Sequence, residues 1–505
     1  MAAALLTDAP TTDAEPDRRR PSWTSSAWLP VGVAVVVKLL VNALVSDRYG
    51  WHIDELYYAD SGRHLDWGYV DFPSVTPVLA AAGRTVLGDS LPALRLVASL
   101  AGAATLVVIG LLVPRFGGGR DAQVLAMLAT FPVVLGANAM FQTVSFDQLA
   151  WALVLLAFLG LRPGSDDLRP WAALGAAIAL AWATKYTVGV LVACLLVGLV
   201  STRSGRARWS HRGALLAAAI VAVAALPNLW WQARHGWPSV DFFGGRHGEV
   251  SDENPPIRFA LELLVLATPL ALPVWVAGVR RLLRPEWRHV GVAAVLVAPV
   301  WLVLGGKSYY ALPVFFVLHA AGAVALAERG RRALPWLIGV STVLALPLIV
   351  PVLPTATMVS SGVADVRDDY SAQLGGPDLA AQVDDAWAGL SPAERSRTVV
   401  LADDYGSAGA VRRFGRGDGG EAPPVVSSAL TNRYWPVPPE ARRADAVLAI
   451  GVEDRWLSGH CTDERRIATV GNRWGVENDL SGSPIVWCEL PPGLTVVEAR
   501  ADLAG

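Results

Sequence analysis

The sequence predicts a polytopic α-helical membrane protein that carries a smaller α/β domain outside the membrane. The 505-residue chain is 53% hydrophobic and only 17% charged, whereas soluble domains carry about 25% charged residues. Long apolar runs follow one another between residues 29 and 353, which is typical of helices that span a bilayer. Residues 354–505 are instead polar, rich in Gly and Pro, and alternate short apolar runs with loops.

About eleven spans are expected in the apolar part of the chain. Several are short, rich in Ala and Val, and interrupted by Pro or Gly, which helices packed on one another tolerate in a membrane. The predicted spans lie near residues 29–46, 92–113, 122–139, 144–161, 171–184, 187–201, 214–232, 257–279, 289–304, 309–327 and 334–353.

Basic residues divide the connecting loops into two alternating sets. The richer set holds Arg18, Arg19, Arg20, Arg115, Arg120, Arg162, Arg169, Arg203, Arg206, Arg208, Arg212, Arg280, Arg281, Arg284, Arg288, Arg329, Arg331 and Arg332. The positive-inside rule places this set in the cytoplasm. Residues 1–28 then form a disordered cytoplasmic tail, residues 29–353 form a membrane domain with an outer loop at 47–91, and residues 354–505 form an extracytoplasmic α/β domain.

The outer loop contains the most unusual stretch, "WHIDELYYADSGRHLDWGYVDFPSVTP" at residues 51–77. Trp and Tyr at an interface can simply form an aromatic belt, with the acids solvated. Carboxylates held among aromatic side chains can also act as general bases, or chelate a divalent cation. Asp54, Glu55 and Asp71 are the candidates for such chemistry, whereas Asp60 is expected to be a bystander.

Two lysines stand at junctions between apolar runs on the same predicted side of the membrane. Lys185 lies in "AWATKYTVG" and Lys307 in "LVLGGKSYYALP". Each side chain can simply extend from a helix end to the interface. A lysine near bilayer depth is, however, usually paired or functional, and its ammonium suits a phosphate. Carboxylates and lysines on one membrane face predict a transferase that uses a lipid-phosphate donor.

Metal binding and disulfide formation provide further candidates. The loop at 233–256 contains His247, which is either a solvated side chain or, with Asp71, a ligand to a divalent metal ion. Cys461 and Cys488 both lie in the predicted outer domain, where an oxidising compartment permits a disulfide. Cys194 lies within a span and is expected only to pack there. Nothing in the sequence indicates a nucleic-acid partner.

The order of the motifs resembles a known family. "DELYYA", "GYVDFPSVTP", "TKYT", "PNLWWQARHGWPS", "GGKSYYALP" and an outer "YGSAG" follow one another over roughly residues 29–450. This order is similar to that in the bacterial protein O-mannosyltransferase-like membrane glycosyltransferases of glycosyltransferase family 39. Lipid A aminoarabinose transferases are relatives of this family, and the resemblance implies the C-type glycosyltransferase fold.

The resemblance implies that the acidic pair Asp54 and Glu55 forms the catalytic centre and that Asp71 is the second acidic site. Many relatives have "D-x-P-P" at this second site, and Ser74 replaces the second Pro here. Members of the family use a polyprenyl-phosphate sugar as donor on the outer face of the membrane. The implied residues at the donor phosphate are Lys185, Lys307, Tyr309 and Tyr310.

The expected reaction is an inverting transfer in which Asp54 orients or deprotonates an acceptor hydroxyl and the lipid phosphate leaves. Lys185 or Lys307, with or without a metal ion, would stabilise the leaving phosphate. The acceptor is a protein, a glycan or a lipid. The "SSALTNRYWPVPP" segment departs from its form in the family, which leaves the roles of Tyr434 and Trp435 open. A transporter or flippase of a lipid-linked or anionic substrate is the rival interpretation, because many spans and intramembrane charges fit it too.

Overall fold

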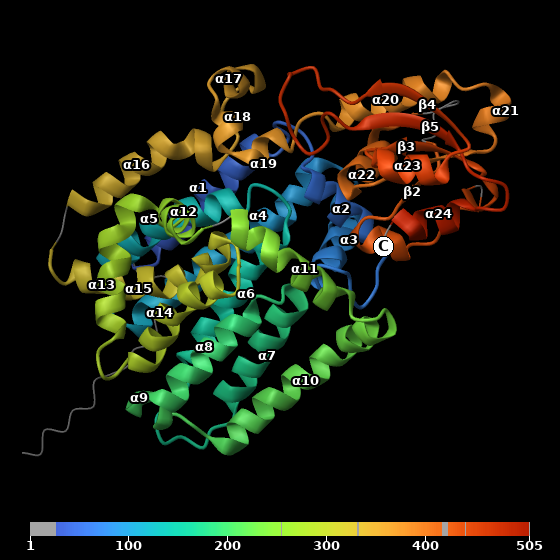
Figure 1. Cartoon of the computed structure of the whole chain (residues 1–505). Coiled ribbons are helices and arrows are strands. Elements are labelled where there is room, and N and C mark those ends of the chain that lie inside the picture. Colours follow the sequence, from blue (N-terminus) through green and yellow to red (C-terminus); the bar gives the residue numbers. More distant parts are fainter. Residues whose placement is uncertain (1–26, 254, 331–332, 417–422, 440, 504–505) are drawn as a thin grey trace, which may run out of the picture.

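The computed structural model describes residues 27–253, 255–330, 333–416, 423–439 and 441–503. A large helical part is followed along the chain by a smaller α/β part, which is drawn in orange and red in Figure 1. The fold class predicted from the sequence is confirmed. The predicted tail at residues 1–28 lies almost entirely outside the described residues.

Each of the eleven predicted spans coincides with a helix or with a pair of consecutive helices. These are α1 (Leu29–Val45), α4 (Leu91–Arg115), α5 (Arg120–Ala137), α6 (Thr143–Phe158), α7 (Arg169–Thr184), α8 (Val188–Ser201), α10 (His211–Arg234), α12 (Pro256–Leu266) with η1 (Pro269–Ala271) and α13 (Leu272–Leu282), α14 (Arg288–Val303), η2 (Ser308–Val314) with α15 (Phe315–Ala327), and α16 (Ala333–Ile349). A four-residue helix, α9 (Arg203–Arg206), follows α8.

Within the described residues, four helices are long and apolar enough to cross a membrane unaided, or five if the bent pair α12–α13 counts as one span. The others are shorter than the roughly 20 residues that a bilayer core needs. The span predicted near residues 257–279 is not one straight helix, because the chain bends there by 83°. Thr268 has a positive φ of 63° at the break, and Pro269 and Pro273 lack the backbone N–H groups that would continue a helix.

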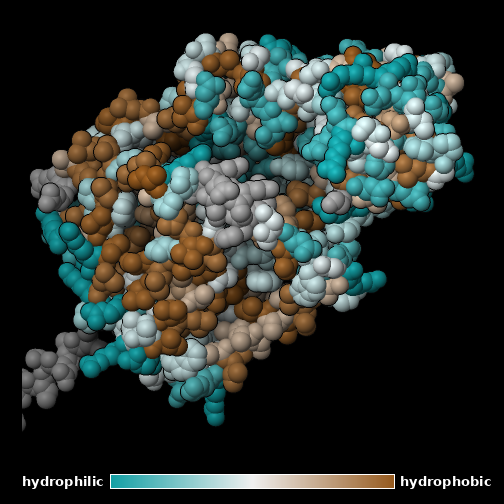
Figure 2. Space-filling view, in the orientation of Figure 1, coloured by the Kyte–Doolittle hydropathy of each residue, from teal (hydrophilic) through white to brown (hydrophobic). Residues whose placement is uncertain are grey.

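The helices pack through small residues. A side chain at Gly322 on α15 would collide with the backbone carbonyl of Val274 on α13, so these two helices require glycine at their crossing. Figure 2 shows hydrophobic residues gathered over the helical part and hydrophilic ones over the α/β part. Leu44, Leu215, Trp336 and Leu344 are among the exposed apolar side chains, as expected for a surface that faces lipid.

Besides the short α9, three described helices of the helical part lie in segments predicted to be loops. Two of them, α2 (Ile53–Ser61) and α3 (Val75–Leu87), lie in the acidic outer loop, and α11 (Pro238–Glu253) lies in the 233–256 segment. An N-cap is usually Ser, Thr, Asp or Asn, whereas His52 caps α2 and forms a capping box with Glu55. Because His is not among the usual capping residues, the start of α2 is not recognisable from the sequence motifs that mark the start of a helix.

The α/β part is built on a five-stranded sheet in the order β2-β1-β3-β5-β4. Three of the short apolar runs in residues 354–505 form strands β1 (Thr398–Ala402), β3 (Ala446–Ile450) and β5 (Pro484–Glu489), and the other two strands are β2 (Val425–Ser427) and β4 (Asp463–Thr469). Strands β1, β2 and β3 run parallel, whereas β5 is antiparallel to both of its neighbours. Separate apolar clusters cover the two faces of the sheet.

Helices and short turns complete the α/β part. The longer helices are α20 (Gly376–Ala388), α22 (Tyr405–Phe414), α23 (Asp454–His460) and α24 (Val496–Leu503). The short elements are α17 (Thr355–Ser360), α18 (Val363–Val366), α19 (Asp368–Ser371), α21 (Pro392–Arg395), η4 (Leu430–Tyr434) and η5 (Ala441–Arg443). Helix α22 packs directly on α2 of the acidic loop.

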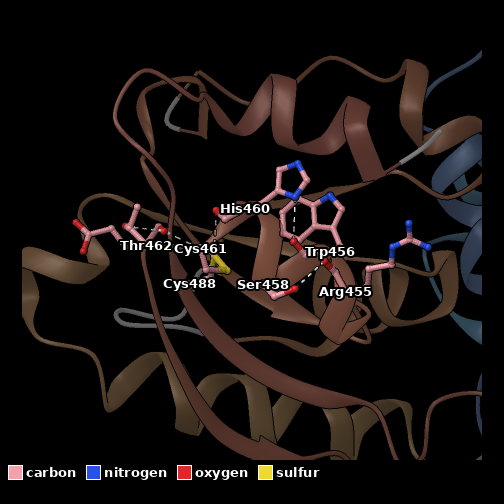
Figure 3. Close-up of a disulfide and its surroundings, with 8 residues drawn as sticks. Arg455, Trp456, Ser458, His460, Cys461, Thr462 and Cys488 are labelled. Atoms are coloured by element: carbon pink, nitrogen blue, oxygen red, sulfur yellow. Dashed lines mark hydrogen bonds between the residues drawn. A yellow bond between two sulfur atoms is a disulfide. The ribbon is translucent and has the colours of Figure 1, made fainter.

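The structure joins Cys461 to Cys488 through a disulfide that links the end of α23 to β5 (Figure 3). Their Cα atoms are 5.4 Å apart, which is within the usual range for such a bond. Cys194 is free and buried, which fits its expected packing role.

Candidate active site

The capping of α2 sets the direction of the acidic pair. The backbone N–H of Asp54 donates to Nδ1 of His52 at 3.0 Å, and the backbone N–H of His52 donates to Oε2 of Glu55 at 3.0 Å. Both acids therefore lie in the first turn of the helix, where the helix dipole favours negative charge.

Glu55 is fully buried, and protein donors occupy both of its carboxylate oxygens. Nε of Arg95 lies 2.9 Å from Oε1 and Nη2 of Arg95 lies 2.7 Å from Oε2. The backbone N–H of Phe141 also donates to Oε1 at 2.9 Å. Arg95, on α4, further donates to the carbonyl of Gly50 at 2.7 Å and to Gln373 at 3.0 Å. This arrangement suits a carboxylate that holds the loop in place.

Asp54 has a different environment from its neighbour. It is partly exposed, and the hydroxyl of Tyr405 donates to its Oδ1 at 2.9 Å. Tyr405 is the first residue of α22, in the α/β part. One oxygen of Asp54 is therefore fixed by the protein, and among the described residues no side chain or backbone group donates a hydrogen bond to the other oxygen.

Asp71 lies beside the same group of aromatic side chains. The hydroxyl of Tyr57 donates to Oδ1 of Asp71 at 3.0 Å, and the rings of Tyr57 and Tyr405 are 4.9 Å apart. Burial raises the pKa of Asp71 to about 7; the negative charge of Asp54 raises it as well, while Tyr57 and the positive charge of Lys185 lower it. At neutral pH the carboxyl group can therefore both accept and donate a proton.

Lys185 is half-buried at the end of α7. Its Nζ lies 4.7 Å from the ring centre of Tyr310 and 5.3 Å from that of Tyr309, within the range of cation–π attraction. These contacts bring together three of the four predicted phosphate-binding residues. The fourth, Lys307, is exposed and immediately precedes η2.

One acid near Lys185 was missed in the sequence. Asp147 on α6 is buried, its two oxygens each lie 3.0 Å from Oγ1 of Thr187, and it interacts electrostatically with Lys185. The available signal was an acid inside an apolar segment, "TVSFDQLAWA".

The metal prediction is left open. The side chain of His247 lies outside the described residues. Among the side chains that the structure does describe, no group of three or more His, Cys, Asp or Glu residues is arranged to hold a metal ion. The hydroxyl of Tyr57 already donates to one oxygen of Asp71.

Asp60, which is expected to take no part in the chemistry, makes two ion pairs within the protein. It is buried, with one oxygen 3.0 Å from Nη1 of Arg63 and the other 3.0 Å from Nη1 of Arg412 on α22. The ring of Trp435 stacks on that of His64 at 4.3 Å. Tyr434 contacts the ring of His235 at 4.8 Å. The "SSALTNRYWPVPP" segment thus lies against the acidic loop.

Comparisons with known proteins agree with this architecture. Residues 71–231 match the family described as dolichyl-phosphate-mannose-protein mannosyltransferase. This segment includes Asp71 and Lys185, whereas Asp54 and Lys307 lie outside it. The lipid A galacturonosyltransferase RgtD of Rhizobium johnstonii is 29% identical over 191 residues, which are 37% of this chain. The match spans only 40% of that relative's length.

The fold is shared with ArnT from Cupriavidus metallidurans. The structure bound to undecaprenyl phosphate superposes with a TM-score of 0.59 at 16% identity and covers 95% of this chain and 100% of ArnT. The apo structure gives a TM-score of 0.57 at 18% identity, over 94% and 98% of the two chains. Residues 71–231 of the chain therefore resemble the mannosyltransferase family, and the chain as a whole shares its fold with ArnT.

Proposed function

We propose that this protein is a membrane glycosyltransferase that moves a sugar from a polyprenyl-phosphate donor to an acceptor hydroxyl. The observation that carries the proposal is one shared site, in which Tyr405 donates to Asp54 and Tyr57 donates to Asp71. The rings of these two tyrosines lie 4.9 Å apart, and the positive charge of Lys185 acts on Asp71. The site also lies where the helical part meets the α/β part, since Tyr405 of α22 contacts Asp54.

The reaction needs one base and one cation. Asp54 accepts the proton of the acceptor hydroxyl while the hydroxyl oxygen attacks the anomeric carbon from the face opposite the lipid phosphate. The bond between that carbon and the phosphate oxygen breaks, and its electron pair leaves with the phosphate. Lys185 stabilises the added negative charge of the leaving group. The product therefore has the inverted configuration.

The position of the site beside the membrane follows from the donor. A polyprenyl chain remains in the bilayer while its phosphate lies at the interface, and the acceptor hydroxyl approaches from water. The name of the matched relative, a lipid A galacturonosyltransferase, favours a lipid acceptor over a protein. The fold shared with ArnT, a structure of which holds undecaprenyl phosphate, favours that class of lipid carrier.

A direct assay separates this function from its rival. Purified protein in vesicles would receive a radiolabelled polyprenyl-phosphate sugar and a lipid A-type or glycan acceptor, and both the labelled acceptor and the sidedness of the donor would be measured. Movement of the donor across the bilayer without any labelled acceptor would favour the transporter or flippase instead.

Orientation is the first testable consequence. The Arg-rich loops predict that residues 354–505 lie outside and that the loop at 202–212 lies in the cytoplasm. Reporter fusions at residues 20, 205 and 400 should give cytoplasmic, cytoplasmic and extracytoplasmic signals. A cytoplasmic signal at residue 400 would place the acids in the compartment opposite to the proposed donor site.

Replacing Lys185 by Ala should weaken donor binding as well as lower the rate, because the contact with the phosphate exists before the reaction begins. A hydrogen bond to a charged group contributes about 1.5–3 kcal/mol, or about 10- to 100-fold in affinity. Lys307→Ala should have the same kind of effect. Titration of donor binding to each variant measures this.

The matched control is Arg329→Ala, which removes an exposed positive charge from the Arg-rich set of loops and should leave donor binding unchanged. If Lys185→Ala bound the donor as tightly as the unmodified protein does, Lys185 would not contact the phosphate.

A further inference from the structure

The α/β part reaches Asp54 directly and reaches Asp71 through one intervening side chain. Tyr405, at the start of α22, donates to Asp54 at 2.9 Å. Burial and the nearby charge of Asp54 raise the pKa of Tyr405, so its hydroxyl retains the proton and acts as a donor at neutral pH. This contact joins residues that are 351 positions apart in the sequence.

The second contact runs through Thr431, in η4. Its buried Oγ1 accepts from the backbone N–H of Val70 at 2.9 Å and lies 2.8 Å from the hydroxyl of Tyr57. Tyr57 also lies 3.0 Å from Asp71. Each hydroxyl has one proton to donate. When Asp71 is ionised, the hydroxyl of Tyr57 donates its hydrogen bond to Asp71, and the hydroxyl of Thr431 donates to the oxygen of Tyr57. Thr431 therefore acts on Asp71 through Tyr57.

The local structure near Tyr405 and Thr431 is tightly constrained, and α22 packs closely against α2. In "YGSAG", a Cβ added at Gly406 would lie 2.8 Å from Ile53, and one added at Gly409 would lie 2.8 Å from Leu56, both on α2. Leu430, directly before Thr431, has a φ of 44°, a conformation that costs a bulky residue energy and is often found at functional sites.

Two ion pairs made by residues further along α22 reinforce the packing of this helix against the acidic loop. Arg412 lies 3.0 Å from Asp60 on α2, and Arg413 lies 2.8 Å from Asp89 after α3. The same helix that carries Tyr405 is thus fixed to both helices of the acidic loop.

We propose that the α/β part positions both acids of the site, with Tyr405 orienting the carboxylate of Asp54 and Thr431 orienting that of Asp71 through Tyr57. This rests on the proposed function, because the acids are taken to act in sugar transfer. A general base must lie within hydrogen-bonding reach of the proton that it removes. A small misplacement can cost about 100-fold in rate.

Kinetics provide the first test. Tyr405→Phe and Thr431→Val should each lower kcat about 10- to 100-fold while the KM for the donor stays nearly constant, because neither residue contacts the phosphate. Thr431→Ser, which keeps the hydroxyl, should restore kcat. Tyr370→Phe is the matched control, since the buried hydroxyl of Tyr370 has no hydrogen-bond partner within the described residues. Unchanged kcat in both Tyr405→Phe and Thr431→Val would overturn the proposal.

A spectroscopic test does not depend on activity. 3-Fluorotyrosine placed at residue 405 of the full-length protein should give a ¹⁹F resonance that shifts when Asp54 is replaced by Asn, whereas the same label at residue 370 should not shift. If the resonance of the label at 405 did not shift on Asp54→Asn, the contact would be refuted. This result does not depend on the folding of Tyr405→Phe or Thr431→Val. A shift at 405 in a protein without transferase activity would retain the contact and reject the proposed function.

Discussion

Replacing Asp54 by Asn is expected to lower the rate of sugar transfer by about 10²- to 10⁴-fold, the usual cost of losing a positioned base. Asn keeps the size of the side chain and still accepts the hydrogen bond from Tyr405, but it does not take a proton from the acceptor. Donor binding should remain nearly unchanged, since the phosphate is assigned to Lys185. Single-turnover transfer and donor titration measure the two quantities separately.

Asp66→Asn is the appropriate control for this experiment. Asp66 is exposed in the same loop and accepts from the backbone N–H of Trp67 at 2.8 Å, a bond that Asn preserves. Asp60→Asn would be a poor control, because Asp60 is buried between Arg63 and Arg412. Transfer by Asp54→Asn at close to the original rate would remove Asp54 from the mechanism.

Glu55→Gln should mainly destabilise the folded protein. Removing one partner of a buried ion pair typically costs about 3–5 kcal/mol, and Gln would also direct an N–H group toward the donors of Arg95 or Phe141. We therefore expect a lower unfolding temperature in detergent and less folded protein. Asp54→Asn, measured beside it, should unfold at close to the original temperature.

A second variant distinguishes a scaffold from a catalyst. The double change Glu55→Gln with Arg95→Gln removes both charges, so it should recover part of the stability that the single change loses. If Glu55→Gln instead folded as stably as the unmodified protein and was inactive, Glu55 would act in the chemistry, as the family resemblance implied.

The sequence by itself determined the architecture of this protein. Apolar runs located eleven helical ranges because a bilayer demands long apolar helices, and the buried strands β1, β3 and β5 were visible as short apolar runs. The sequence also identified the acidic loop and Lys185, because charged residues near bilayer depth are conspicuous in an apolar chain. It did not reveal α2, whose cap is His52, or the bend at Thr268.

The tertiary structure decided what the individual acids contact. Asp54 and Glu55 are adjacent in the chain, but consecutive residues point about 100° apart around a helix. Glu55 therefore faces Arg95 in the protein interior, while Asp54 faces the site. Tyr405 and Thr431 reach this loop across 351 and 374 positions of sequence. Periodicity and motifs describe only local geometry, so contacts made by packing one part of the chain on another become visible only in the folded molecule.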